Sequence, residues 1–198
     1  VNPLAILYRI NMAIDKSSIK LYDCKDSKYI QIKQMSYIED GIRKTWDVVN
    51  SYDSASILIH NIDNDSVIIV KQFRPAVFLR NNNGYMYELC AGLIDKENKT
   101  IDEIIKEEAL EECGYQVESV TKIAEFYSSV GTSGSKQSVF YAEVNNNQKI
   151  ANGGGIDDEC IEVVEIKVNE MQDFLKLNNI TPSLGFSFMW FLSNKKAN

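Results

Sequence analysis

The sequence predicts an α/β sandwich with a small antiparallel β unit in front of it. Several short segments have the apolar pattern of β-strands, a central segment has the spacing of an amphipathic helix, and further helical patterns follow near the end of the chain. The 198 residues, 44% hydrophobic and 25% charged, suffice for one ordinary domain, or for one domain with a small addition.

The N-terminal β unit is expected within residues 1–50. Residues 28–38 alternate in part between apolar and polar side chains, Asp40-Gly41 supplies a hairpin turn, and residues 42–49 return as a second strand. A hairpin of this size is not stable by itself, and its aromatic content suggests that it packs against something. We therefore expect a homodimer in which this unit contributes to the interface and to the nucleotide pocket.

The main domain is expected to cover residues 51–198. It should contain strands at residues 55–60, 66–73, 85–90, 119–127, 137–144 and 160–168, and helices at Ile101–Cys113, 169–177 and 183–193. Polar loops are expected at residues 81–84 and 145–159. The second loop contains Gly153-Gly154-Gly155, and a long glycine-bearing loop should be mobile without ligand.

The charge balance excludes some classes of partner. A net charge of −7 and a pI near 4.9 argue against non-specific binding to nucleic acid or to acidic lipid, because both require a basic surface. A phosphate substrate would then need a local cation. Residues 1–8 form a short apolar run that Arg9 interrupts, so we expect neither a signal peptide nor a membrane span.

The cysteines and the single histidine give no metal-binding spacing. Cys24, Cys90, Cys113 and Cys160 are scattered without a C-x-x-C pair, and His60 is the one histidine, so no zinc-finger spacing can be written. The four cysteines could in principle pair, but we expect reduced thiols and a cytoplasmic protein.

The segment Ile101–Cys113 has the end signals of a helix. Thr100 is a candidate N-cap, Glu103 would complete a capping box, and Gly114 follows at the position that favours a left-handed residue. At about 100° per residue, Ile104 and Ile105 define the buried stripe, whereas Glu103 and Glu107 face solvent.

The other glutamates of this helix lie on its apolar side. Glu108 and Glu112 fall between Ile104 and Ile105 on the helical wheel, and Glu111 falls beside Ile104. Burying ionised carboxylates costs several kcal/mol each unless a basic group, a proton or a cation compensates. Glu108 and Glu112 are one turn apart, a spacing that suits Mg²⁺ or Mn²⁺. A solvated acidic face is the alternative.

The stretch from Gly92 to Tyr115 resembles the signature of the Nudix hydrolases, G-x5-E-x7-R-E-U-x-E-E-x-G-U. Residues 108–114, E-A-L-E-E-C-G, match its helical half. Two features depart from it. The span from Gly92 to Gly114 is one residue longer, and Glu107 occupies the position of the family arginine. The early glutamate has no clean counterpart, with Glu97 and Asn98 both near its position. These departures leave the loop geometry open.

The flanking sequences resemble the UDP-glucose pyrophosphatase branch of this family. The similar segments are residues 70–77, 87–93, 131–137, 153–155 and 159–164. This branch also carries the one-residue extension and lacks the arginine of the signature. The resemblance extends from about Trp46 to the end of the chain. It implies an α/β/α sandwich with a mixed sheet and the hydrolysis of a nucleoside-diphosphate sugar, with attack of water on one phosphorus.

The resemblance also assigns roles to the carboxylates. It implies that Glu108, Glu112 and the main-chain carbonyl of Ala91 bind Mg²⁺, with Mn²⁺ possible, and that Glu111 assists catalysis. Glu159 would complete the metal site or position the water, with an exposed strand-edge acid as the alternative. Asp157 and Asp158 are weaker candidates. His60 is expected to be structural, so a carboxylate should act as the general base.

Three further residues are candidates for substrate contact. Arg74 resembles the phosphate-contacting arginine of the branch, against the alternative of a surface ion pair. Trp46 resembles an aromatic residue that stacks on the nucleobase, although core packing is the more common role of a strand Trp. Glu88 precedes the signature and either supports the metals or is an ordinary polar strand residue.

The expected function is therefore hydrolysis of a UDP-glucose-like substrate to UMP and a sugar 1-phosphate. An ADP-ribose or ADP-sugar pyrophosphatase is the alternative within the same family, because the same scaffold serves both. A binding module of this fold that has lost catalysis is the second alternative, and the intact set Glu108, Glu111 and Glu112 argues against it.

Overall fold

Strand β3 (Ser54–Asn61) is the centre of a mixed sheet, because its apolar residues Ala55, Ile57, Leu58 and Ile59 are fully buried on both faces. The computed structural model describes residues 14–24, 26–27, 29–156 and 159–195. The apolar run at residues 1–8, Asp157 and Asp158 lie outside this range.

The sheet has seven strands among the described residues. Besides β3 these are β4 (Ser66–Phe73), β5 (Tyr85–Glu88), β6 (Cys90–Leu93), β7 (Thr121–Tyr127), β8 (Lys136–Val144) and β9 (Ile161–Lys167). The main path runs β5-β4-β3-β8-β7, with β6 paired to β3 and β9 to β4. Only the β3–β8 pair is parallel within this sheet as described, so the expected mixed sheet is confirmed.

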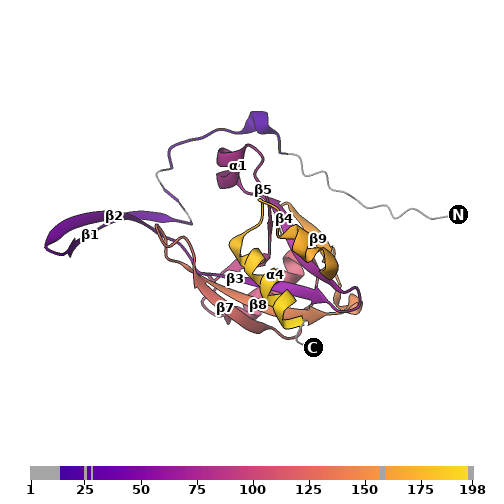
Figure 1. Cartoon of the computed structure of the whole chain (residues 1–198). Helices are drawn as coiled ribbons and strands as arrows, with labels where there is room; N and C mark the ends of the chain where they lie inside the picture. Colours follow the sequence, from indigo (N-terminus) through magenta and orange to yellow (C-terminus); the bar gives the residue numbers. More distant parts are fainter. Residues whose placement is uncertain (1–13, 25, 28, 157–158, 196–198) are drawn as a thin grey trace.

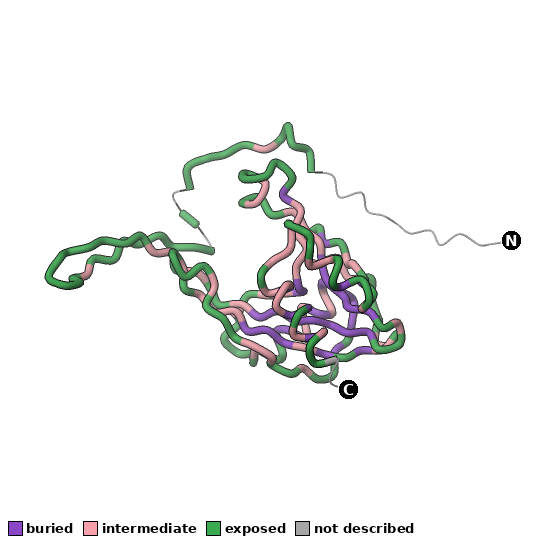
Figure 2. Tube along the Cα trace, viewed as in Figure 1, coloured by how far each residue is buried: buried purple, intermediate pink, exposed green. Residues whose placement is uncertain are grey.

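Helices cover both faces of this sheet. Helix α2 (Ile101–Cys113) packs through Ile105 and Ala109 on a cluster that includes Ile57 and Ile59. Helix α4 (Pro182–Lys195) packs on the opposite face, where Leu184 and Phe188 belong to the same cluster as Leu58. Figure 1 shows α4 lying across the sheet, and Figure 2 shows the buried strands. The expected α/β/α sandwich is therefore confirmed.

Several element boundaries differ from expectation. The single strand expected at residues 85–90 is two strands, because β5 pairs with β4 whereas β6 pairs with β3. A helix that the sequence did not predict, α1 (Pro75–Asn81), precedes the loop at residues 82–84 and begins at a proline, as helices often do. The helix expected at 169–177 is reduced to η3 (Val168–Glu170) and α3 (Met171–Phe174).

The N-terminal hairpin forms a separate two-stranded sheet. Strands β1 (Gln31–Glu39) and β2 (Ile42–Asn50) are antiparallel, and Asp40 and Gly41 between them both have positive φ, as the expected hairpin turn requires. The hairpin extends away from the seven-stranded sheet and is exposed along its length (Figures 1 and 2). Its exposed apolar side chains include Ile32, Ile38, Ile42 and Trp46.

Within the described part of the chain, no helix is long and apolar enough to span a membrane.

Candidate functional site

Helix α2 forms as its end signals predict. The Thr100 side chain accepts a hydrogen bond from the Glu103 N–H, and the Glu103 carboxylate accepts one from the Thr100 N–H, which completes the capping box. Gly114 ends the helix with a φ of 78°. The helix is thereby fixed at both ends, with its acidic side chains in a defined position.

The acids on the apolar side of α2 are buried, as the helical wheel indicates. Glu112 is 4% exposed, and its Oε2 accepts a hydrogen bond of 3.1 Å from the Ala91 N–H. Glu108 and Glu111 are half-buried, whereas Glu103 is exposed. The face of α2 that turns toward the sheet therefore carries carboxylates beside Ile104 and Ile105.

Burial changes the proton affinity of two of these groups. Desolvation, together with the negative charges of Glu108 and Glu159, raises the pKa of Glu112 to about 7. Desolvation and the neighbouring Glu111 likewise raise the pKa of Glu108 to about 7. Each carboxylate is thus destabilised in its charged form, and a cation placed between them would relieve this.

Gly92 gives the Glu108 carboxylate its room. A Cβ at position 92 would lie 2.2 Å from Glu108 Oε1, closer than any side-chain contact allows. β6, which contains Ala91 and Gly92, therefore approaches α2 at the level of Glu108 and Glu112. Glycine is needed at this position to leave the Glu108 carboxylate where it lies, although the φ of Gly92 is ordinary.

The donor set fits a small hard cation. Mg²⁺ takes one or two carboxylates and keeps water molecules for a phosphate substrate, and Glu108, Glu112 and the Ala91 carbonyl provide such oxygen donors. Among the described residues, no three His, Cys, Asp or Glu side chains are grouped closely enough to hold a metal by themselves. The site thus offers two helix carboxylates and a main-chain oxygen, as a metal shared with substrate and water requires.

The glycine loop caps the C-terminal end of α2. The N–H groups of Gly154 and Gly155 donate to the main-chain oxygens of Glu112 and Glu111, at 2.8 and 3.1 Å. A Cβ at Gly153 would lie 2.4 Å from the Glu112 carbonyl oxygen. The loop therefore satisfies helix-end carbonyls that would otherwise have no partner.

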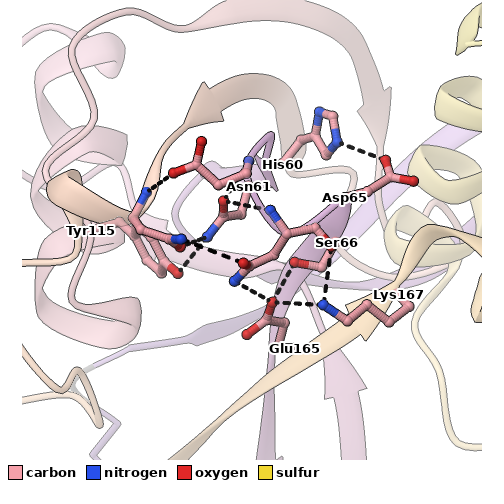
Figure 3. A network of polar contacts seen from close by, with 10 residues as sticks. His60, Asn61, Asp65, Ser66, Tyr115, Glu165 and Lys167 are labelled. Carbon is pink, nitrogen blue, oxygen red and sulfur yellow. Dashed lines mark hydrogen bonds and ion pairs between the residues drawn. The ribbon is translucent and has the colours of Figure 1, made fainter.

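The first part of the same loop is held at the far end of β3, as Figure 3 shows. The Asn61 side chain donates to Asn146 Oδ1 at 2.8 Å and to Tyr115 Oη at 3.3 Å, and its Oδ1 accepts from the Asp63 N–H. The Asn146 N–H also donates to the Asp63 carboxylate. Residues 145–155 are therefore hydrogen-bonded at both ends, and the mobility of the loop without ligand stays a prediction.

Glu159 follows this loop and is exposed. Its Oε2 accepts a hydrogen bond of 3.2 Å from the Ile156 N–H, and a Cβ at Gly155 would lie 2.6 Å from the same oxygen. Its charge contributes to the raised pKa of Glu108 and of Glu112. The loop therefore brings the Glu159 carboxylate into electrostatic range of the α2 acids.

Arg74 and Glu88, two candidate substrate residues, form one ion pair. Arg74 Nε and Nη2 donate to the two oxygens of Glu88 at 2.7 and 2.8 Å. This pairing raises the pKa of Arg74, and the negative charges of Glu112 and Glu159 raise it further. Glu88 thus positions the guanidinium, and Arg74 Nη1 is not used by the pair.

Glu107 occupies the position at which the resemblance leads one to expect arginine. Its carboxylate accepts hydrogen bonds from Lys99 at 2.6 Å and from Lys96 at 3.3 Å. In this contact the helix carries the negative charge, on Glu107, and the preceding loop carries the positive charges, on Lys96 and Lys99. Glu107 therefore joins the helix to the preceding loop through these two lysines.

Trp46 and His60 lie apart from the carboxylates. Trp46 Nε1 donates to the Gly131 carbonyl oxygen at 2.8 Å, in the loop between β7 and β8, and the residue is 52% exposed. His60 is buried near the far end of β3, where its Nδ1 lies 3.1 Å from Tyr141 Oη and its Nε2 lies 3.6 Å from Asp65 (Figure 3 shows the Asp65 contact).

The structure contains a cavity that was not predicted from the sequence, next to Ala91, whose N–H binds the Glu112 carboxylate. It has a volume of about 570 Å³ and lies between the sheet and the start of α4. Glu88 and Ala91 line one part of it, and Ser56 contributes from β3. The available signal was Ser56 itself, a hydroxyl residue within the apolar run of a central strand.

Known proteins resemble the chain over most of its length, although no family model matches it. The chain is 33% identical to the uridine diphosphate glucose pyrophosphatase of Mus musculus in an alignment of 202 positions. This alignment covers 86% of this chain and 91% of the relative. The protein of the same name from Bos taurus gives the same values. The chain is also 37% identical over 145 residues to the GDP-mannose pyrophosphatase of Shigella flexneri, covering 72% of this chain and 75% of that one.

Proposed function

The chain belongs to the Nudix hydrolase family, and from this membership we propose that it hydrolyses the diphosphate of a nucleoside-diphosphate sugar. A UDP-glucose-like substrate would give UMP and a sugar 1-phosphate. The relatives are named as pyrophosphatases of UDP-glucose and of GDP-mannose. The observation that carries the proposal is the pair Glu108 and Glu112. Burial raises the pKa of both carboxylates, and both lie against strand β6, Glu108 at Gly92 and Glu112 at Ala91.

We propose Glu108, Glu112 and the Ala91 carbonyl as ligands of Mg²⁺, with Mn²⁺ as a possible substitute, and Glu159 as a further ligand whose carboxylate would move closer when the metal binds. When bound, such a cation would neutralise charge on the diphosphate and lower the pKa of the attacking water. Among the residues that the structure describes, neither Glu108 nor Glu112 forms an ion pair with Lys or Arg, although the charge of Lys96 lowers the pKa of Glu108. A bound cation would supply the compensating charge that the burial of the two carboxylates calls for.

The remaining groups would orient substrate and water. Arg74 would bind a phosphate oxygen through Nη1, while Glu88 holds its other two nitrogens. Glu111, Glu112 and Glu159 are the proposed catalytic carboxylates, and one of them, acting as the general base, would take the proton of the water that attacks phosphorus. The glycine loop supports this proposal, since it joins Glu159 to the main chain of Glu111 and Glu112.

We further propose two functional units, with residues 1–50 serving dimerisation and residues 51–198 carrying the chemistry. The exposed apolar side chains of the hairpin support a second copy of the chain as its partner. In that dimer Trp46 would contact the nucleobase. Light scattering at micromolar concentration should give the mass of a homodimer, and deletion of residues 1–50 should give a monomer. A full-length chain that scatters as a monomer would remove this proposal.

We propose a cytoplasmic location, which the four free cysteines support.

The substrate preference is tested by kcat/KM for UDP-glucose and for ADP-ribose under one set of conditions with Mg²⁺. We expect UDP-glucose to be preferred, because the ratio measures the difference in transition-state binding between the two substrates. A preference of about tenfold or more for ADP-ribose, or about 1.4 kcal/mol, would assign the chain to the ADP-ribose alternative and leave the proposed catalytic residues in place.

A further inference from the structure

The cavity between the sheet and α4 has the size of a small-molecule site. Its volume of about 570 Å³ lies within the usual range for ligand pockets. Glu88 and Ala91 line it, and these residues also contact the Arg74 guanidinium and the Glu112 carboxylate. A substrate whose diphosphate lies at these groups would therefore extend one of its two ends into this cavity.

Ser56 places an unsatisfied hydroxyl in the cavity wall. The residue is 1% exposed, and its Oγ has no hydrogen-bond partner among the described residues. It lies opposite Ala91 in the β3–β6 pairing, so its position is fixed by the sheet. Buried polar atoms are almost always hydrogen-bonded in folded proteins, so an unpartnered hydroxyl on a residue that lines a cavity is a candidate for a hydrogen bond to a bound ligand.

We propose that this cavity binds the sugar of the nucleotide sugar, and that Ser56 is a specificity-determining residue that hydrogen-bonds one sugar hydroxyl. The inference rests on the proposed function. It places the sugar end of the substrate in the cavity, because the carboxylates of α2 do not distinguish one sugar from another. The nucleoside then lies outside this cavity.

The chemistry of the lining favours a neutral, polyhydroxylated group. Most of its polar residues carry a hydroxyl, which can donate and accept as a sugar hydroxyl does. Besides Ser56 the polar residues are Tyr127, Ser128, Ser129, Thr181 and Ser183, with Gln137 as the amide and Glu88, paired with Arg74, as the one carboxylate among the described lining residues. None of the described lining residues is Lys or Arg, so a second phosphate is disfavoured.

The aromatic wall of the cavity complements this polar side. Phe126 and Phe186 meet edge to face, with ring centroids 4.9 Å apart, and Tyr127 lies next to them in the lining. Their apolar surface would cover the C–H face of a sugar ring while the hydroxyls reach its edge. A nucleobase would stack between two parallel rings, whereas Phe126 and Phe186 meet edge to face and leave no such gap between them.

The chain supplies a matched control for Ser56. Ser187 in α4 is also fully buried with an unpartnered Oγ among the described residues, but it does not line the cavity. Ser56→Ala and Ser187→Ala therefore each remove one buried, unsatisfied hydroxyl, and a purely structural effect should be similar in both variants. Only Ser56→Ala should change the binding of a sugar.

The test is calorimetric titration of the full chain with glucose 1-phosphate and, separately, with UMP, both in Mg²⁺. We expect Ser56→Ala to weaken glucose 1-phosphate by about fivefold, the loss of one hydrogen bond, and to leave UMP unchanged. Ser187→Ala should change neither. Weaker UMP binding in Ser56→Ala, with glucose 1-phosphate unchanged, would assign the cavity to the nucleoside and overturn the proposal. Unchanged binding of both would also overturn it.

The same titrations separate this proposal from the proposed function. If the wild-type chain hydrolyses no nucleotide sugar but binds glucose 1-phosphate in a Ser56-dependent way, the catalytic proposal fails and the sugar site stands. If it hydrolyses UDP-glucose while Ser56→Ala binds both products normally, the sugar site fails and the catalytic proposal stands.

Discussion

Glu112→Gln is expected to lower the turnover of a nucleotide sugar by about several hundredfold, because it removes one charge at the proposed metal site while keeping the shape of the side chain. The glutamine can still accept the hydrogen bond from the Ala91 N–H, so the fold should be retained. Steady-state kinetics in Mg²⁺ measures the effect. Near-normal turnover in this variant would mean that Glu112 is not a ligand.

The same variant has an expected effect on stability in the opposite direction. Because the pKa of Glu112 is raised by burial, the metal-free protein loses stability as the pH rises from about 5 to about 8, where the folded state has to bury the charge. Glu112→Gln should therefore raise the free energy of unfolding in EDTA by about 1–3 kcal/mol at pH 8, and by less at pH 5. Asp102→Asn, on the exposed side of α2, is the control and should leave turnover unchanged.

Gly92→Ala is expected to lower turnover by about a hundredfold with little loss of stability. The added Cβ would meet the Glu108 Oε1, Cδ and Cγ at 2.2, 2.4 and 2.5 Å, and all three atoms belong to a flexible side chain that can move aside. The backbone at Gly92 does not require positive φ, so folding should tolerate alanine. The displaced carboxylate should raise the Mg²⁺ concentration needed for activity, since a shift of about 1 Å can cost a hundredfold in rate.

Gly185→Ala is the matched control for this substitution. Its Cβ would meet only ordinary contacts at 3.9 Å or more, so stability and turnover should stay close to wild type. If Gly92→Ala retains full activity at low Mg²⁺, the Glu108 carboxylate does not have to lie where the structure has it, and its role as a ligand is contradicted. A thermal unfolding scan of both variants separates misfolding from a local displacement.

The sequence was informative where local rules and tertiary packing agree. The capping box at Thr100 and Glu103, Gly114 at the helix end and the carboxylates beside Ile104 could all be predicted for α2, because each depends on residues close in sequence. The mixed sheet followed from the strand patterns and from the family resemblance. The pairing of the strands could not be predicted in the same way, because β5 and β6 are separated by the single residue Leu89 and pair with different strands.

The rest depends on contacts between distant segments. The Arg74–Glu88 pair joins residues 14 positions apart, and the glycine loop reaches α2 over about 40 residues of sequence, so neither could be read from a local pattern. The same is true of the cavity, whose wall combines β3, β7 and the start of α4. Ser56 gave a hint as a polar residue in an apolar strand, but only the sheet shows what it faces.

The most direct test of the account is to incubate the chain with UDP-glucose in Mg²⁺ and, in parallel, in excess EDTA, and to identify the products by phosphorus NMR. The account predicts UMP and glucose 1-phosphate in equal amounts with Mg²⁺, and no turnover with EDTA. Turnover that is unaffected by EDTA, or intact UDP-glucose and GDP-mannose after prolonged incubation with Mg²⁺, would contradict it.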